Sequence, residues 1–97
     1  MSKLMNFINS YELQVLDNDM LEIVMGASMR TLNRKFKYEN GFTIIHYHKN
    51  YVAKNIISDA KLQGKSKKKY FEEIIENKIN IYWSNYKSFN TFMNNKQ

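Results

Sequence analysis

The chain has 97 residues, a hydrophobic fraction of 43% and a net charge of +6 at pH 7, and it contains no cysteine. This length and apolar content indicate one small folded domain, and the missing cysteines exclude disulfides and thiolate metal sites. The positive charge favours a polyanionic partner such as DNA, RNA or an acidic membrane face. With no proline and only three glycines, we expect an all-α chain of about six helices.

Three helices are predicted in the first half of the chain, over residues 4–10, from 17 to 26 and from 28 to about 38. Each follows a residue whose side-chain oxygen can accept hydrogen bonds from the free amides of a first helical turn. These N-cap residues are Ser2, Asp17 and Ser28. Gly26 suits the left-handed position that ends a helix, and Asn40-Gly41 breaks the third helix.

The segment after Gly41 carries conflicting signals. Residues 42–48 have the β-branched and aromatic content of a strand, which would make the fold a winged helix-turn-helix. Thr43, however, can cap a helix, and apolar residues at near-helical spacing favour a long helix over residues 44–62. Two further helices are predicted over 70–78 and 84–94. In the first of them we expect an apolar side, formed by Tyr70, Ile74 and Ile75.

The helix that follows Ser28 has an apolar side and a basic side. Leu32 and Phe36 lie four residues apart and therefore share a face, which we expect to pack against the preceding helix. The expected partners on that helix are Met20, Leu21 and Val24. The basic side then points towards solvent or DNA, and an ordinary solvated face is the alternative interpretation.

The polar residues of the basic side are of the types that read a major groove. The predicted base contacts are Arg30, Asn33 and Arg34, because arginine pairs with guanine O6 and N7 and asparagine with adenine N6 and N7. Phosphate contacts come from small hydroxyl and lysine side chains. The predicted ones are Ser28, Thr31 and Lys37, with Lys65, Lys67, Lys68 and Lys69 in a lysine-rich bend.

This segment resembles the first helix-turn-helix of the AraC/XylS transcription activators. The matching positions are Gly26, Ser28, Leu32, Arg34, Phe36, Lys37, Gly41, Thr43 and Tyr47. The resemblance covers residues 4–47 and implies that Arg30, Asn33 and Arg34 contact bases. It also implies two recognition helices joined by a long helix, so that each enters a successive major groove.

A second, weaker resemblance lies in residues 83–90, which are similar to the start of the family's second recognition helix. It implies that Tyr86, Lys87 and Asn90 face DNA. Tyr82 stands where the family has a glycine, and Thr91 stands where it has an arginine. The expected organisation is thus a single DNA-binding domain over 1–97. Its parts are a first subdomain (1–47), a linking helix (44–62) and a degenerate second subdomain (65–97).

We therefore expect a cytoplasmic, non-enzymatic transcription regulator of a bacterium or mobile element, with double-stranded DNA as its partner and no cofactor. RNA polymerase or another regulator is a further partner, and no membrane is expected, because no apolar run is long enough to span one. His46 and His48 lie two residues apart without a third ligand, so no metal site is expected.

Two alternatives to this function stay open. One is a winged-helix DNA-binding protein of plasmid partition or replication. The other is a protein-interaction module on a helix-turn-helix scaffold, such as a regulator antagonist or a phage-encoded inhibitor. The oligomeric state is not predicted.

Overall fold

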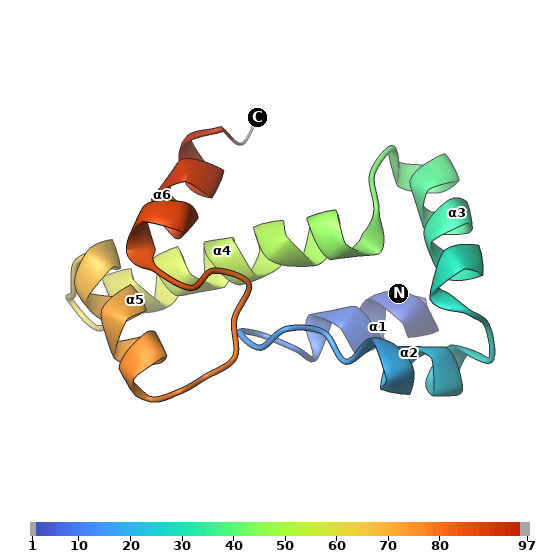
Figure 1. The fold of residues 1–97 in the computed structure, drawn as a ribbon, viewed down its shortest axis with the longest axis horizontal. Helices are drawn as coiled ribbons and strands as arrows, with labels where there is room; N and C mark the ends of the chain where they lie inside the picture. Colours follow the sequence, from blue (N-terminus) through green and yellow to red (C-terminus); the bar gives the residue numbers. More distant parts are fainter. Residues whose placement is uncertain (1, 96–97) are drawn as a thin grey trace. The chain divides into compact units, whose positions relative to one another are not determined.

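The computed structural model describes residues 2–95, which form six α-helices and no strand (Figure 1). The helices are α1 (Lys3–Asn9), α2 (Asn18–Met25), α3 (Met29–Asn40), α4 (Ile44–Leu62), α5 (Lys67–Glu76) and α6 (Tyr86–Asn94). The predicted all-α fold is confirmed, with α4 the longest helix at 19 residues. A strand over 42–48 is wrong, because residues 44–48 lie in α4. No helix in the described part of the chain is both long and apolar enough to cross a membrane.

Side-chain caps fix most of the helix starts. The three predicted caps are confirmed, since the side chains of Ser2, Asp17 and Ser28 accept hydrogen bonds from amides of the following turn. Helix α5 begins three residues earlier than predicted, because the Ser66 hydroxyl caps it by accepting from the Lys69 amide (3.1 Å). Helix α6 begins two residues later than predicted, after its own cap, Asn85.

The chain divides into two compact units, each with its own core. Within the described residues, the first unit comprises 2–12 and 16–51, and the second comprises 13–15 and 52–95. Helix α4 contributes to both, and the boundary along it falls between Tyr51 and Val52.

In the first unit, α1 packs on α2, and α3 follows α2 through a short turn (Figure 1). Leu21 of α2 packs with Leu32 and Phe36 of α3, as predicted. The prediction for Met20 is wrong: its side chain is 44% exposed, and Met25 packs against the core instead. The reason is helical geometry, because Leu21 and Met25 lie four residues apart on one face of α2 and Met20 turns away from it.

Three side chains of α4 contact the end of α1 and the residues that follow it in the first unit. The hydroxyls of Tyr47 and Tyr51 donate to the side-chain oxygen and the carbonyl oxygen of Asn9, at 3.0 and 3.1 Å. The buried His48 ring lies with Nε2 2.6 Å from the Tyr11 carbonyl oxygen. Burial lowers the pKa of His48, so the neutral ring donates through Nε2 to this acceptor.

The core of the second unit is rich in aromatic rings. Phe71 of α5 stacks on Phe89 of α6 with ring centroids 5.1 Å apart, and Trp83 meets Phe89 edge-on at 5.0 Å. These contacts correct the apolar side that was predicted for α5. Ile74 is buried as expected, but Phe71 is the main buried residue and Ile75 is exposed.

Candidate nucleic-acid interface

A tight turn sets the start of α3 relative to α2. Gly26 adopts the left-handed conformation (φ 68°), and its amide donates to the Glu22 carbonyl oxygen at 2.8 Å. The Ser28 hydroxyl then accepts from the Thr31 amide and donates to the Thr31 hydroxyl, both at 3.2 Å. The Gly26 bond thus satisfies a carbonyl oxygen in the last turn of α2, and the Ser28 cap satisfies a free amide in the first turn of α3.

The Glu22 side chain adds a contact that the sequence did not reveal. Its Oε2 accepts a hydrogen bond from the Met29 amide at 2.6 Å, so a carboxylate of α2 sits at the first turn of α3. A negative charge there is favourable, because amides and the helix dipole make a helix N-terminus positive. The same charge disfavours a phosphate at this end of α3.

Arg30 and Arg34 lie along the exposed side of α3, away from the buried Leu32 and Phe36. Their spacing of four residues places them on one face. Among residues 2–95, no side chain or backbone group forms an ion pair or hydrogen bond with either guanidinium group. Lys37, in the last turns of α3, is exposed as well. This helix therefore presents a cationic face with its donors unoccupied by the described chain.

Asn33 lies on the flank of α3 and has a structural contact. Its Oδ1 accepts a hydrogen bond from the Ile44 amide at 2.9 Å, while Thr43 Oγ1 accepts from the His46 amide at 3.2 Å. Two free amides in the first turn of α4 are thereby satisfied. Bidentate reading of adenine uses both the oxygen and the nitrogen of the amide, and here the oxygen already holds the start of α4.

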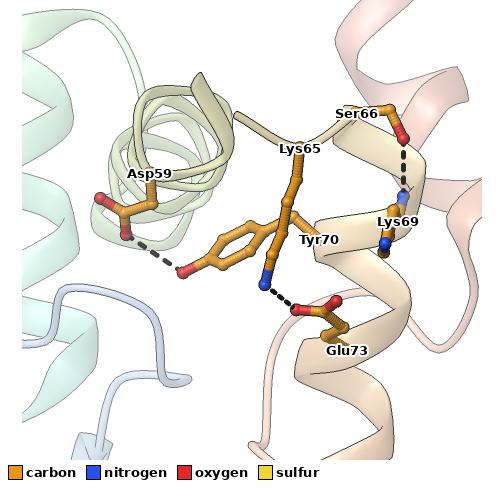
Figure 2. Close-up of polar contacts among 6 residues, drawn as sticks. All are labelled: Asp59, Lys65, Ser66, Lys69, Tyr70 and Glu73. Carbon is orange, nitrogen blue, oxygen red and sulfur yellow. Dashed lines mark hydrogen bonds and ion pairs between the residues drawn. The ribbon is translucent and has the colours of Figure 1, made fainter. Parts of the chain in front are cut away.

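The lysine-rich bend joins α4 to α5 in the second unit, and its members differ in their surroundings. Lys65 Nζ lies 2.6 Å from Glu73 Oε1 in an ion pair, with both side chains about one-third exposed (Figure 2). Lys67, Lys68 and Lys69 are exposed in the first turn of α5. The structure thus separates one paired lysine from three solvent-facing ones.

A second polar contact spans the same bend. The Tyr70 hydroxyl of α5 lies 3.4 Å from Asp59 Oδ2 of α4 (Figure 2). Partial burial, and then the negative charge of Asp59, raise the pKa of Tyr70. The neutral phenol is therefore the donor. This bond ties α5 to the last turns of α4, while the Lys65–Glu73 pair ties the bend to α5, and the two contacts together position the first turn of α5 with its three exposed lysines.

The predicted second recognition helix, α6, presents fewer polar groups. Tyr86 is half-buried, and its ring meets that of Phe71 at 5.8 Å. Lys87 is exposed and Asn90 is half-buried on the same helix. Lys87 is the one cation of α6, so this helix has no counterpart of the arginine face of α3.

No group of three or more His, Cys, Asp or Glu side chains in the described part of the chain is placed to hold a metal ion. Comparison of the chain with protein-family models, with curated proteins and with solved structures finds no match in any of the three.

Proposed function

We propose that the chain binds double-stranded DNA in a sequence-specific manner by placing α3 in a major groove. One observation carries the proposal: Arg30 and Arg34 share an exposed face of a helix whose two ends are fixed by caps, and no described carboxylate pairs with them. Arginine is the commonest specific partner of guanine, because its two parallel donors match O6 and N7.

The remaining predicted contacts take different parts in this proposal. Lys37 and the three exposed lysines of α5 bind phosphates, which supplies affinity without sequence preference. Asn33 acts mainly by holding the start of α4 against α3, since its oxygen is engaged by Ile44. Lys65 does not contact phosphate in this proposal, because its ammonium group is paired with Glu73.

The biological role that we propose is regulation of transcription in a bacterium or a mobile element. The support is the resemblance of residues 4–47 to the first helix-turn-helix of AraC/XylS activators, together with the capped α2–α3 turn. For α6 we propose at most an auxiliary contact through Lys87, with Tyr86 serving chiefly the core.

Selection of bound duplexes from a random pool tests the proposal. We expect enrichment of one motif that contains guanines for the two arginines. A single short block indicates that α3 alone reads bases, whereas two blocks about 10 base pairs apart indicate that α6 reads as well. A pool that stays random after repeated rounds contradicts sequence-specific binding.

A second candidate function is contact with a protein, either RNA polymerase, another regulator or a target that the chain inhibits. It is favoured by two apolar side chains on α2, Met20 and Ile23, which are 44% and 74% exposed. They lie three residues apart and so form one small patch. If protein contact is the main function, the unaltered chain binds its protein partner but no duplex DNA. The Ile23→Asp variant then loses the complex with that partner.

A further inference from the structure

Tyr38 stands out in the last turns of α3. Its side chain is 92% exposed, and among residues 2–95 nothing forms a hydrogen bond or ring contact with it. A single exposed aromatic residue is ordinary on a protein surface, so exposure alone assigns no role. Its position along the helix is what makes it informative.

Tyr38 lies on the arginine face of α3. It follows Arg34 by four residues and Arg30 by eight, so the three side chains form one stripe on the side opposite Leu32 and Phe36. At about 1.5 Å per residue, Tyr38 is about 12 Å along the axis from Arg30. A major groove is also about 12 Å wide.

The two ends of this stripe differ in what they can bind. At the N-terminal end, the Glu22 carboxylate receives the Met29 amide, and the hydroxyls of Ser28 and Thr31 bond to each other. A phosphate is therefore disfavoured there. At the C-terminal end, Lys37 and Tyr38 offer an ammonium group and a hydroxyl group that are both exposed.

We infer that the Tyr38 hydroxyl donates a hydrogen bond to a phosphate oxygen of the strand that borders the groove occupied by α3. The inference rests on the proposed function and adds a direction to it: the N-terminal part of α3 reads bases and the C-terminal end meets the backbone. Tyrosine hydroxyls are regular donors to phosphate oxygens. A neutral donor of this kind orients the helix without adding to the salt dependence.

Binding of the Tyr38→Phe and Tyr38→Ala variants to duplex DNA tests this inference. Two duplexes are used, the one enriched by selection and a scrambled version of it, and affinities are measured over a range of salt concentrations. We expect Tyr38→Phe to weaken binding to both duplexes by about five-fold, the loss of one hydrogen bond. The ratio between the two affinities and the slope against log salt stay unchanged, because no charge is removed.

Leu62→Ala is the matched control, since it truncates another large side chain that is 83% exposed at the end of α4. We expect it to bind both duplexes like the unaltered chain. Equal binding by the Tyr38 variants and the unaltered chain overturns the inference and leaves the proposed function intact. A loss confined to the enriched duplex also overturns it, because it assigns Tyr38 to a base. Absence of duplex binding by the unaltered chain instead refutes the proposed function itself.

Discussion

Helices α3 and α5 both carry several basic residues, and both begin with a serine cap, yet they arrange their charges differently. On α3, Arg30 and Arg34 follow one face of the helix. On α5, the lysines are confined to the first turn, and acidic residues follow them. These acidic residues are Glu72, Glu73 and Glu76.

The difference separates two kinds of nucleic-acid contact. A face of spaced arginines can follow the base edges of a groove, since each guanidinium group offers a planar pair of donors. A cluster of lysines at one helix end acts as a set of point charges and suits the phosphate backbone. The number of basic residues hardly distinguishes the two helices, four on α3 and three on α5, but the placement of these residues and of the acidic residues does.

The largest effects should come from the cores beneath the two helices. Phe36→Ala and Phe71→Ala each remove a buried ring, from below α3 and α5 respectively. We expect each to lower the free energy of unfolding by about 3–5 kcal/mol, as measured by urea denaturation. At temperatures where both variants remain folded, Phe36→Ala should lose base preference and Phe71→Ala should keep it. Equal loss of preference would remove the distinction between the two helices.

Replacement of Arg34 tests the arginine face directly. Arg34→Ala should cost about 1–3 kcal/mol in binding to the enriched duplex and relax the preference at one base position. Arg34→Lys keeps the charge but loses the paired donors, so it should retain affinity for scrambled duplex while losing preference. Lys54→Ala, at an exposed position of α4, removes a charge elsewhere and serves as the control. If Lys54→Ala reduces base preference as much as Arg34→Ala, the arginine face is not the reader.

Asn33 allows its structural and its DNA-reading roles to be separated. Asn33→Ala should lower the free energy of unfolding by about 1 kcal/mol, because the Ile44 amide loses its acceptor. Asn33→Asp keeps an acceptor at that point, so thermal unfolding should show near-normal stability. Its negative charge beside the arginine face should nevertheless weaken duplex binding. Normal stability of Asn33→Ala would rule out the capping role.

The smallest effect is expected at the lysine-rich bend. Glu73→Gln frees Lys65 from its ion pair, which is partly exposed and so contributes less than about 1 kcal/mol to stability. We expect tighter binding to duplexes of any sequence, with a salt slope that steepens by about 0.9 if Lys65 then meets a phosphate. Glu76→Gln removes an equal charge from an exposed position of the same helix. The same gain in both variants would show that general charge, and not the release of Lys65, is responsible.

Local signals in the sequence predicted most of the helix boundaries. The caps Ser2, Asp17 and Ser28 and the stop at Gly26 each act within one helical turn, so neighbouring residues were enough to identify them. The residues after Gly41 form a helix despite their β-branched and aromatic composition. Thr43 and Asn33 favour the helix, because they satisfy the first amides of α4.

The contacts that shape the candidate interface could not be predicted in the same way. Glu22 reaches Met29 across seven residues, and Lys65 reaches Glu73 across eight, so each contact depends on how the chain turns between two helices. The residue types alone marked Lys65 as a phosphate ligand, whereas its ion pair follows from the α4–α5 bend. That Arg30 and Arg34 share a face follows from their spacing, but that they lack a carboxylate partner among the described residues required the structure.

The most direct test of the proposed arginine reader is the ratio of dissociation constants for the scrambled and the enriched duplex. We would measure it at one salt concentration for the unaltered chain and for the variant that combines Arg30→Ala with Arg34→Ala. We expect a large ratio for the unaltered chain and a ratio near one for the variant, whose residual binding comes from the lysines. A variant that stays folded and keeps the full ratio would show that bases are read elsewhere.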